Sequence, residues 1–170
     1  MERKNSRIYN MALCGVFAAL ITVFTAYIGH VPVGVNGGYV HFGDGLIYLA
    51  AAILPMPYAM LAGAIGGGIA DLLTAPAWAI ATVMIKMLIV IPFSNKGNKI
   101  VSKRNIVAPV ISYFISATGY FLAEALLFGT KTAILTSFSG SLVQSSGSMI
   151  FFLMLGVTLD RVGFKAKMGA

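Results

Sequence analysis

Long apolar runs separate the charged residues of this 170-residue chain, and they constrain its fold more than any other feature. Only 10% of the residues are charged and 58% are hydrophobic, whereas about 25% of the residues in soluble domains are charged. A chain of this composition cannot make an ordinary water-facing surface, so the lipid bilayer must be the solvent for most of it. We therefore expect a single all-α membrane domain over residues 1–170.

The positions of the basic residues predict the topology. Cytoplasmic flanks of membrane helices are enriched in Lys and Arg, so three basic clusters should face the cytoplasm. The clusters lie in the N-terminal tail, in the 94–105 loop and near the C-terminus: Arg3, Lys4 and Arg7; Lys96, Lys99, Lys103 and Arg104; Arg161, Lys165 and Lys167. Because these charges flank apolar segments and are not spread along one surface, the net charge of +7 does not indicate nucleic-acid binding.

With the central basic loop inside, an even number of spans must precede it and an even number must follow it. Residues 9–28 form one span, but residues 44–93 are too long for one helix across a ~30 Å core. We expect three helices there, each about 16–18 residues long and therefore short for a span. Prolines break them apart: Pro55, Pro57 and Pro76. Spans at 106–128 and roughly 141–160 complete six transmembrane helices, with both the N- and the C-terminus cytoplasmic.

By this topology residues 29–43 form a long external loop between the first and second helices. Glycines, a proline and two histidines predict a poor helix, whereas the valines and aromatic residues make the segment too apolar for a solvated linker. We expect a lid over the helix bundle, and the alternative is an ordinary connector. Asn36, Tyr39 and His41 are the side chains of this loop that we expect to reach a ligand.

Five polar residues fall inside the predicted spans, each on a different helix. Ionisable residues in a membrane are costly and by default face a cavity or the bundle interior. Asp44, Asp71, Lys86, Glu124 and Gln144 all fall at mid-depth or in the outer half, which predicts a pocket that opens outward. Asp44 could instead cap its helix, and Asp71 could be a hydrated helix end. For Lys86, too deep to reach either surface, we expect an internal partner, either Asp71 or Glu124.

Helical spacing adds aromatic and hydroxyl groups to this pocket. Trp78 and Thr82 share a face with Lys86, Tyr120 shares one with Glu124, and Ser148 shares one with Gln144. Stacking area beside a few donors and acceptors suits a small heteroaromatic ligand. The full set of candidate substrate-binding residues is Asn36, Tyr39, His41, Asp44, Asp71, Trp78, Thr82, Lys86, Tyr120, Glu124, Gln144 and Ser148. The sequence has no P-loop, no H-E-x-x-H motif and no Cys/His cluster, so we expect no catalytic residue, no metal and no cofactor.

Four pieces of the chain carry a family resemblance. They are the small-residue helix at 12–20, the segment 38–44, the end of the glycine-rich helix at 70–73, and residues 79–86 with their lysine. Together these resemble the substrate-binding S components of energy-coupling factor (ECF) transporters, in particular the riboflavin-type branch that includes predicted pyridoxine and hydroxymethylpyrimidine carriers. The resemblance implies a six-helix subunit of the bacterial plasma (inner) membrane. Such a subunit would capture a vitamin or precursor outside and deliver it through a transmembrane coupling protein and two cytoplasmic ATPases.

The resemblance also implies that small residues on the first helix meet the coupling protein. Ala12, Gly15 and Ala19 are the expected docking residues, although Cys14 and Ala18 have the same spacing, and such a stripe can also serve internal packing. Mixed acidic and basic groups favour a B6-type or hydroxymethylpyrimidine ligand over riboflavin. Two alternatives stay open: a standalone secondary carrier, and a membrane-embedded acid/base enzyme.

Overall fold

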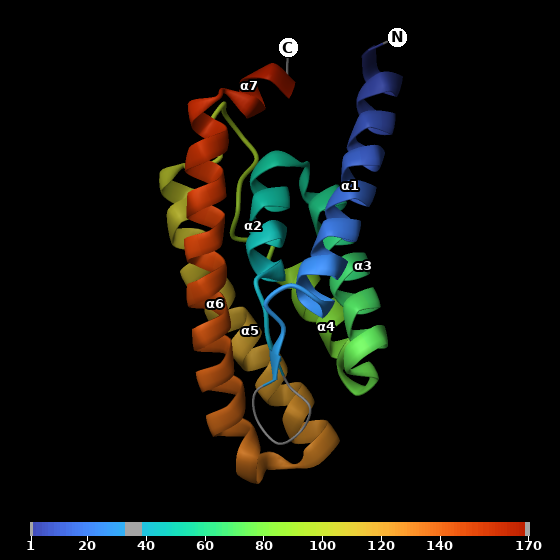
Figure 1. The fold of residues 1–170 in the computed structure, drawn as a ribbon, viewed down its shortest axis with the longest axis vertical. Helices are drawn as coiled ribbons and strands as arrows, with labels where there is room; N and C mark the ends of the chain where they lie inside the picture. The colour runs from blue at the N-terminus through green and yellow to red at the C-terminus, as the bar shows by residue number, and fades with distance from the viewer. Residues whose placement is uncertain (1, 33–38, 169–170) are drawn as a thin grey trace.

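The computed structural model describes residues 2–32 and 39–168, and almost all of this chain is helical (Figure 1). The helices follow one another in the order α1 (Glu2–Ala26), α2 (Gly43–Ile53), α3 (Met56–Thr74), the 3₁₀ turn η1 (Pro76–Trp78), α4 (Ala79–Leu88), α5 (Lys103–Phe128), α6 (Thr130–Arg161) and α7 (Phe164–Met168). A two-residue strand pair, β1 (Val31–Pro32) with β2 (Tyr39–Val40), lies between α1 and α2. The predicted all-α class is therefore confirmed.

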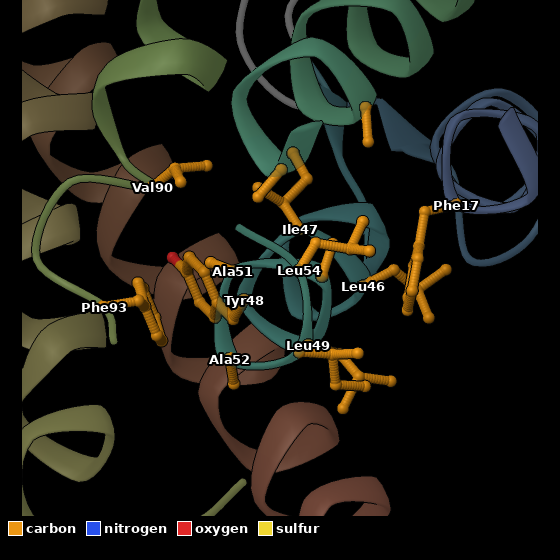
Figure 2. Packing of buried hydrophobic residues seen from close by; sticks show 14 of the residues in the cluster. Phe17, Leu46, Ile47, Tyr48, Leu49, Ala51, Ala52, Leu54, Val90 and Phe93 are labelled. Carbon is orange, nitrogen blue, oxygen red and sulfur yellow. The ribbon is translucent and has the colours of Figure 1, made fainter. Parts of the chain in front are cut away.

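Helix α2 occupies the middle of the molecule. It packs against α1 and α3 on one side and against α6 on the other, while α1 packs on α3 and α5 packs on α6 (Figure 1). Every residue of α2 is buried, so the helix is apolar all round rather than on one face. Its side chains form the centre of the hydrophobic core, where the Tyr48 ring stacks on Phe93 with 4.9 Å between the ring centroids (Figure 2).

Within residues 2–32 and 39–168, four helical segments are long and apolar enough to cross a membrane, namely Arg7–Ala26, Met56–Thr74, Lys103–Phe128 and Ser137–Arg161. The expected length of about 16–18 residues is wrong for α2 and α4, which have 11 and 10 residues. Helix α2 is short because the chain before it is a hairpin and because Leu54 is extended before Pro55. At ~1.5 Å per residue α2 covers only about half of the hydrocarbon core. The count of six spans stays a prediction.

The chain termini and the turn between α5 and α6 mark opposite ends of the bundle. The N- and C-termini lie at the same end of the molecule, and the turn between α5 and α6 lies at the opposite end (Figure 1). This turn consists of Gly129 alone, whose φ of 92° only glycine adopts without strain. The expected beginning of the last helix near residue 141 is therefore wrong, because α6 starts directly after Gly129.

The segment between α1 and α2 is not helical where it is described, as its composition predicts. Val31 pairs with Val40 and Pro32 with Tyr39 in an antiparallel hairpin. Asn36 lies outside the described residues, and so does the side chain of Tyr39. The hairpin delivers the chain into the bundle, so that α2 begins at depth and not at the surface (Figure 1).

The loop between α4 and α5 is fixed by two polar side chains. Asn105 accepts a hydrogen bond from Ser94 N (2.8 Å) and donates to Ser94 O (2.9 Å) and Ile100 O (2.8 Å). The Asp160 carboxylate on α6 accepts from the backbone N–H groups of Ile100 (2.7 Å) and Val101 (2.9 Å). The loop that carries the central basic cluster is therefore an ordered part of the fold.

Close packing of α1 on α3 depends on Gly66. A Cβ atom at this position would lie 2.7 Å from the Ala18 carbonyl oxygen and 2.7 Å from Ile21 Cβ. The approach also lets Thr22 Oγ1 donate to Gly66 O at 3.1 Å. At Gly15, by contrast, a Cβ would have no neighbour within 4 Å.

We expect Gly66→Ala to lower the free energy of unfolding by about 1–3 kcal/mol, because backbone atoms must move apart to admit the methyl group. Gly15→Ala is the matched control, since it makes the same change in helix propensity on the partner helix without a clash. Denaturant titration of both variants in detergent measures the difference. Equal stability of the two variants would contradict the close α1–α3 contact.

Candidate functional site

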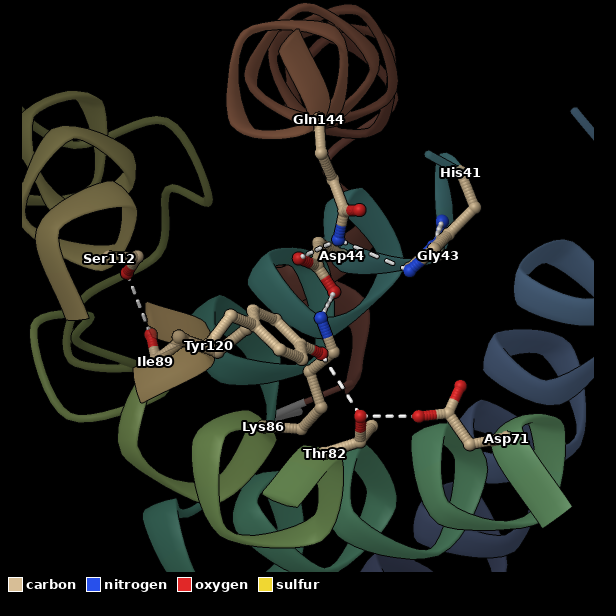
Figure 3. Close-up of polar contacts among 10 residues, drawn as sticks. All are labelled: His41, Gly43, Asp44, Asp71, Thr82, Lys86, Ile89, Ser112, Tyr120 and Gln144. Carbon is tan, nitrogen blue, oxygen red and sulfur yellow. Dashed lines mark hydrogen bonds and ion pairs between the residues drawn. The ribbon is translucent and has the colours of Figure 1, made fainter. Parts of the chain in front are cut away.

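A buried ion pair lies at the centre of the bundle. Lys86 on α4 contacts Asp44 in the first turn of α2, with 2.6 Å between Nζ and Oδ1 (Figure 3). Asp44 is 0% exposed and Lys86 is 1% exposed. The lysine stem fits because α3 has a glycine beside it: a Cβ on Gly67 would lie 2.9 Å from Lys86 Cγ. Two full charges held away from water are stable only as a pair with further hydrogen bonds.

Gln144 supplies such a bond to Asp44, and His41 in turn contacts Gln144. Gln144 Nε2 on α6 donates to Asp44 Oδ2 at 2.8 Å and lies 3.1 Å from His41 Nε2. The other ring nitrogen of His41, Nδ1, accepts from the backbone N–H of Gly43 at 3.0 Å. These contacts join the end of the hairpin, the start of α2 and the middle of α6 (Figure 3).

A second group of polar side chains lies on the other side of Lys86. Thr82 Oγ1 donates to Asp71 on α3 and lies 3.1 Å from the hydroxyl oxygen of Tyr120 on α5. The Lys86 ammonium is 5.5 Å from the centroid of the Tyr120 ring, within cation–π range. Trp78 meets the same ring edge-on, with 5.9 Å between the centroids. Lys86 and Tyr120 thus link both groups into one network that draws on five helices.

The partner of Lys86 differs from the expected one. Sequence spacing favours Asp71 or Glu124, but the ion pair is with Asp44. The reason is that α2 starts inside the bundle, so its first turn lies level with the last turn of α4, which carries Lys86. Asp44 is not the N-cap of α2 either, because Phe42 occupies that position and Asp44 is the second residue of the helix. Asp71 is buried at 4% exposure and contacts Thr82, so it is not a hydrated helix end.

Glu124 occupies a separate polar contact nearer the α5–α6 turn. Its carboxylate accepts a hydrogen bond from Ser137 on α6 at 2.7 Å, and both residues are buried. Sequence analysis does not identify Ser137, because the expected start of the last helix places it in a loop. Once α6 is extended to Thr130, Ser137 lies two turns before Gln144 on the same helix.

Three buried serine and threonine hydroxyl groups make no hydrogen bond within the described part of the chain: Ser148 Oγ, Ser116 Oγ and Thr25 Oγ1. Ser148 lies one turn after Gln144, and Ser116 lies one turn before Tyr120. A buried polar group without a partner costs about 1–3 kcal/mol. Of these three only Ser148 belongs to the predicted set, and all three are free to bond to a polar ligand.

The side chains of this network are suited to binding a small molecule. It combines a carboxylate, an ammonium group, an amide, an imidazole and aromatic rings on rigid helices, which is the usual make-up of a small-molecule site. Among the described residues no group of three or more His, Cys, Asp or Glu side chains is placed to hold a metal ion.

We expect Lys86→Met to destabilise the protein by about 3–5 kcal/mol, because it leaves Asp44 charged and buried without its cation. The double variant Asp44→Asn/Lys86→Met should recover most of this loss, since a neutral pair no longer needs compensation. Unfolding in detergent, followed by the fluorescence of the single tryptophan, Trp78, measures both. Additive losses in the double variant would show that the two side chains do not interact.

Two comparisons with known proteins bear on this site. The family model described as ECF-type riboflavin transporter, S component, matches residues 5–161. A curated protein from Pyrococcus woesei, described as an uncharacterized protein in a gap 3' region, is 27% identical over 143 residues, which cover 83% of this chain and 95% of that protein.

Proposed function

Because this chain belongs to the family of ECF-type riboflavin transporter S components, we propose that it captures a small heteroaromatic vitamin or precursor in the polar network around Asp44 and Lys86. Membership of the family makes the protein a substrate-binding subunit of a transporter, a multi-pass membrane protein and not an enzyme. The alternative hypothesis of a membrane-embedded acid/base enzyme that uses Asp71, Lys86 and Glu124 is therefore wrong. A subunit role also argues against a standalone carrier.

The observation that carries the proposal is the buried Asp44–Lys86 pair with Gln144 beside it. Charged and amide groups on separate helices are costly in a membrane unless a cavity or a ligand uses them. Both signs of charge are present, so a neutral or amine-bearing heterocycle fits better than a polyanion. We favour a B6-type or hydroxymethylpyrimidine compound, and riboflavin, which the family description names, is the competing ligand.

The ligand contacts that we propose are those of the sequence-derived set. Twelve residues belong to it: Asn36, Tyr39, His41, Asp44, Asp71, Trp78, Thr82, Lys86, Tyr120, Glu124, Gln144 and Ser148. The free hydroxyls of Ser116 and Thr25 join this set as further donors. Trp78 and Tyr120 would supply the stacking surface.

Helix α1 offers the docking surface for the coupling protein in this proposal. Ala12, Gly15 and Ala19 are exposed, so partner backbone can approach them closely. In the competing register Cys14 and Ala18 are buried, and Cys14 Sγ donates to Tyr58 O at 3.2 Å. Burial in the fold supports the Gly15–Ala19 register over the alternative.

Topology and location complete the proposal. Both chain termini lie at one end of the bundle, and the ordered loop with the central basic cluster is tied to that end through Asp160 (Figure 1). The positive-inside rule then places this end in the cytoplasm. We propose the bacterial plasma (inner) membrane as the location, with a coupling protein and two ATPases on the cytoplasmic side.

The ligand is tested by native mass spectrometry of the purified chain, followed by titration with pyridoxine, hydroxymethylpyrimidine and riboflavin while Trp78 fluorescence is recorded. We expect Gln144→Leu to weaken binding by about tenfold, or about 1.4 kcal/mol, through loss of a buried hydrogen bond. Ser112→Ala is the control, because Ser112 donates to Ile89 O and lies outside the proposed set. Binding that is unchanged in Gln144→Leu would remove the network from the site.

The docking surface is tested separately. Gly15→Leu should prevent co-purification with the coupling protein and leave ligand affinity within about twofold, because Gly15 is exposed and a Cβ atom there has no neighbour within 4 Å. Ile80→Leu is the control, because it changes an exposed apolar side chain on α4, outside the proposed docking surface. Normal assembly of Gly15→Leu would place the partner on another helix.

A further inference from the structure

A groove on the outside of α5 is lined by none of the residues of the polar network. It has a volume of about 520 Å³ and is lined by Ile91, Pro92, Arg104, Val107, Ile111 and Ile115. All of these side chains are apolar except the arginine, and none of them belongs to the proposed ligand site. In a membrane protein such a groove faces lipid, so its natural occupant is an acyl chain.

The lining residues of α5 form one stripe along the helix. Arg104, Val107, Ile111 and Ile115 recur at i, i+3, i+7 and i+11, which keeps them on one side. Eleven residues of helix rise ~16 Å, about half of a ~30 Å hydrocarbon core. The stripe therefore has the length of one leaflet, with the arginine at its interfacial end and isoleucines toward the bilayer centre.

Arg104 is held in place at the head of this groove. Its Nε donates to Pro92 O at 2.7 Å and its Nη2 donates to Ile91 O at 3.3 Å. Both carbonyls belong to groove residues, so the guanidinium group is anchored while Nη1 stays available. A planar guanidinium with free donors binds phosphate well and does so at little further entropy cost.

The exposed charged side chains of the loop and helix end beside the groove are basic. Lys96, Lys99 and Lys103 are exposed on the same ordered loop and helix end, and within the part of the chain whose side chains are described none of them pairs with a carboxylate. The nearby Asp160 carboxylate is occupied by two backbone N–H groups. A basic interfacial site above an apolar groove is complementary to an anionic lipid.

We propose that this groove is a binding site for an anionic phospholipid, with its phosphate at Arg104 and one acyl chain along Val107, Ile111 and Ile115. The site is independent of the vitamin site, because the two share no residue. The site makes the transporter subunit prefer an anionic phospholipid beside α5.

Native mass spectrometry of the full chain in detergent, titrated with dioleoylphosphatidylglycerol and dioleoylphosphatidylcholine, tests the proposal. We expect the wild type to bind phosphatidylglycerol more tightly, and Arg104→Gln to reduce this preference by roughly fivefold. Arg161→Gln is the matched control, an exposed arginine on α6 at the same end of the molecule. Val107→Trp, at a position that is 55% exposed, should fill the groove and weaken both lipids without unfolding the protein.

The proposal fails if the wild type does not prefer phosphatidylglycerol, or if Arg104→Gln and Arg161→Gln lose the preference equally. It also fails if Val107→Trp binds both lipids normally but no longer assembles with the coupling protein, since the groove would then be a protein interface. Thermal unfolding of each variant, with and without phosphatidylglycerol, separates loss of the site from loss of the fold. A stabilisation by phosphatidylglycerol that disappears in Arg104→Gln supports the site even if that variant is less stable.

Discussion

The Asp44–Lys86 ion pair is the interaction on which the interior of this protein depends. Both charges are buried, so each is tolerable only because the other is there. To bring them together, α2 must begin inside the bundle, α3 must carry a glycine beside the lysine stem, and α6 must place an amide against the carboxylate. The short α2, the hairpin before it and the glycines of α3 are all consistent with this single requirement.

The polar network and the apolar core share the same helix. One end of α2 carries Asp44, whereas the remainder supplies Ile47, Tyr48 and their neighbours to the centre of the core (Figure 2). The position of the site is therefore fixed by close packing and not by flexible loops. Rigid placement keeps the polar groups pre-organised, which reduces the entropy lost when a ligand binds.

Much of this arrangement could be predicted from the sequence, for physical reasons. Low charge and long apolar runs predict an all-α membrane protein. A lysine among apolar residues in a membrane must find an internal partner. Periodicity also placed Thr82 beside Lys86 and Ser148 beside Gln144. The identity of the partner, Asp44, could not be predicted, because it depends on the depth at which α2 begins, and a hairpin of irregular sequence sets that depth. The start of the last helix was missed for a similar reason: Gly129 alone, with its positive φ, makes the turn, where the sequence suggests a loop that runs on to about residue 141.

The complete burial of α2 has a consequence for biogenesis. An eleven-residue segment with a carboxylate near its start is too short to cross the hydrocarbon core by itself. Its neighbours α1 and α3 are long enough to insert independently. The second helix must therefore enter the bilayer only when these two have come together and Lys86 is at hand, so that assembly of the native protein follows an obligatory order.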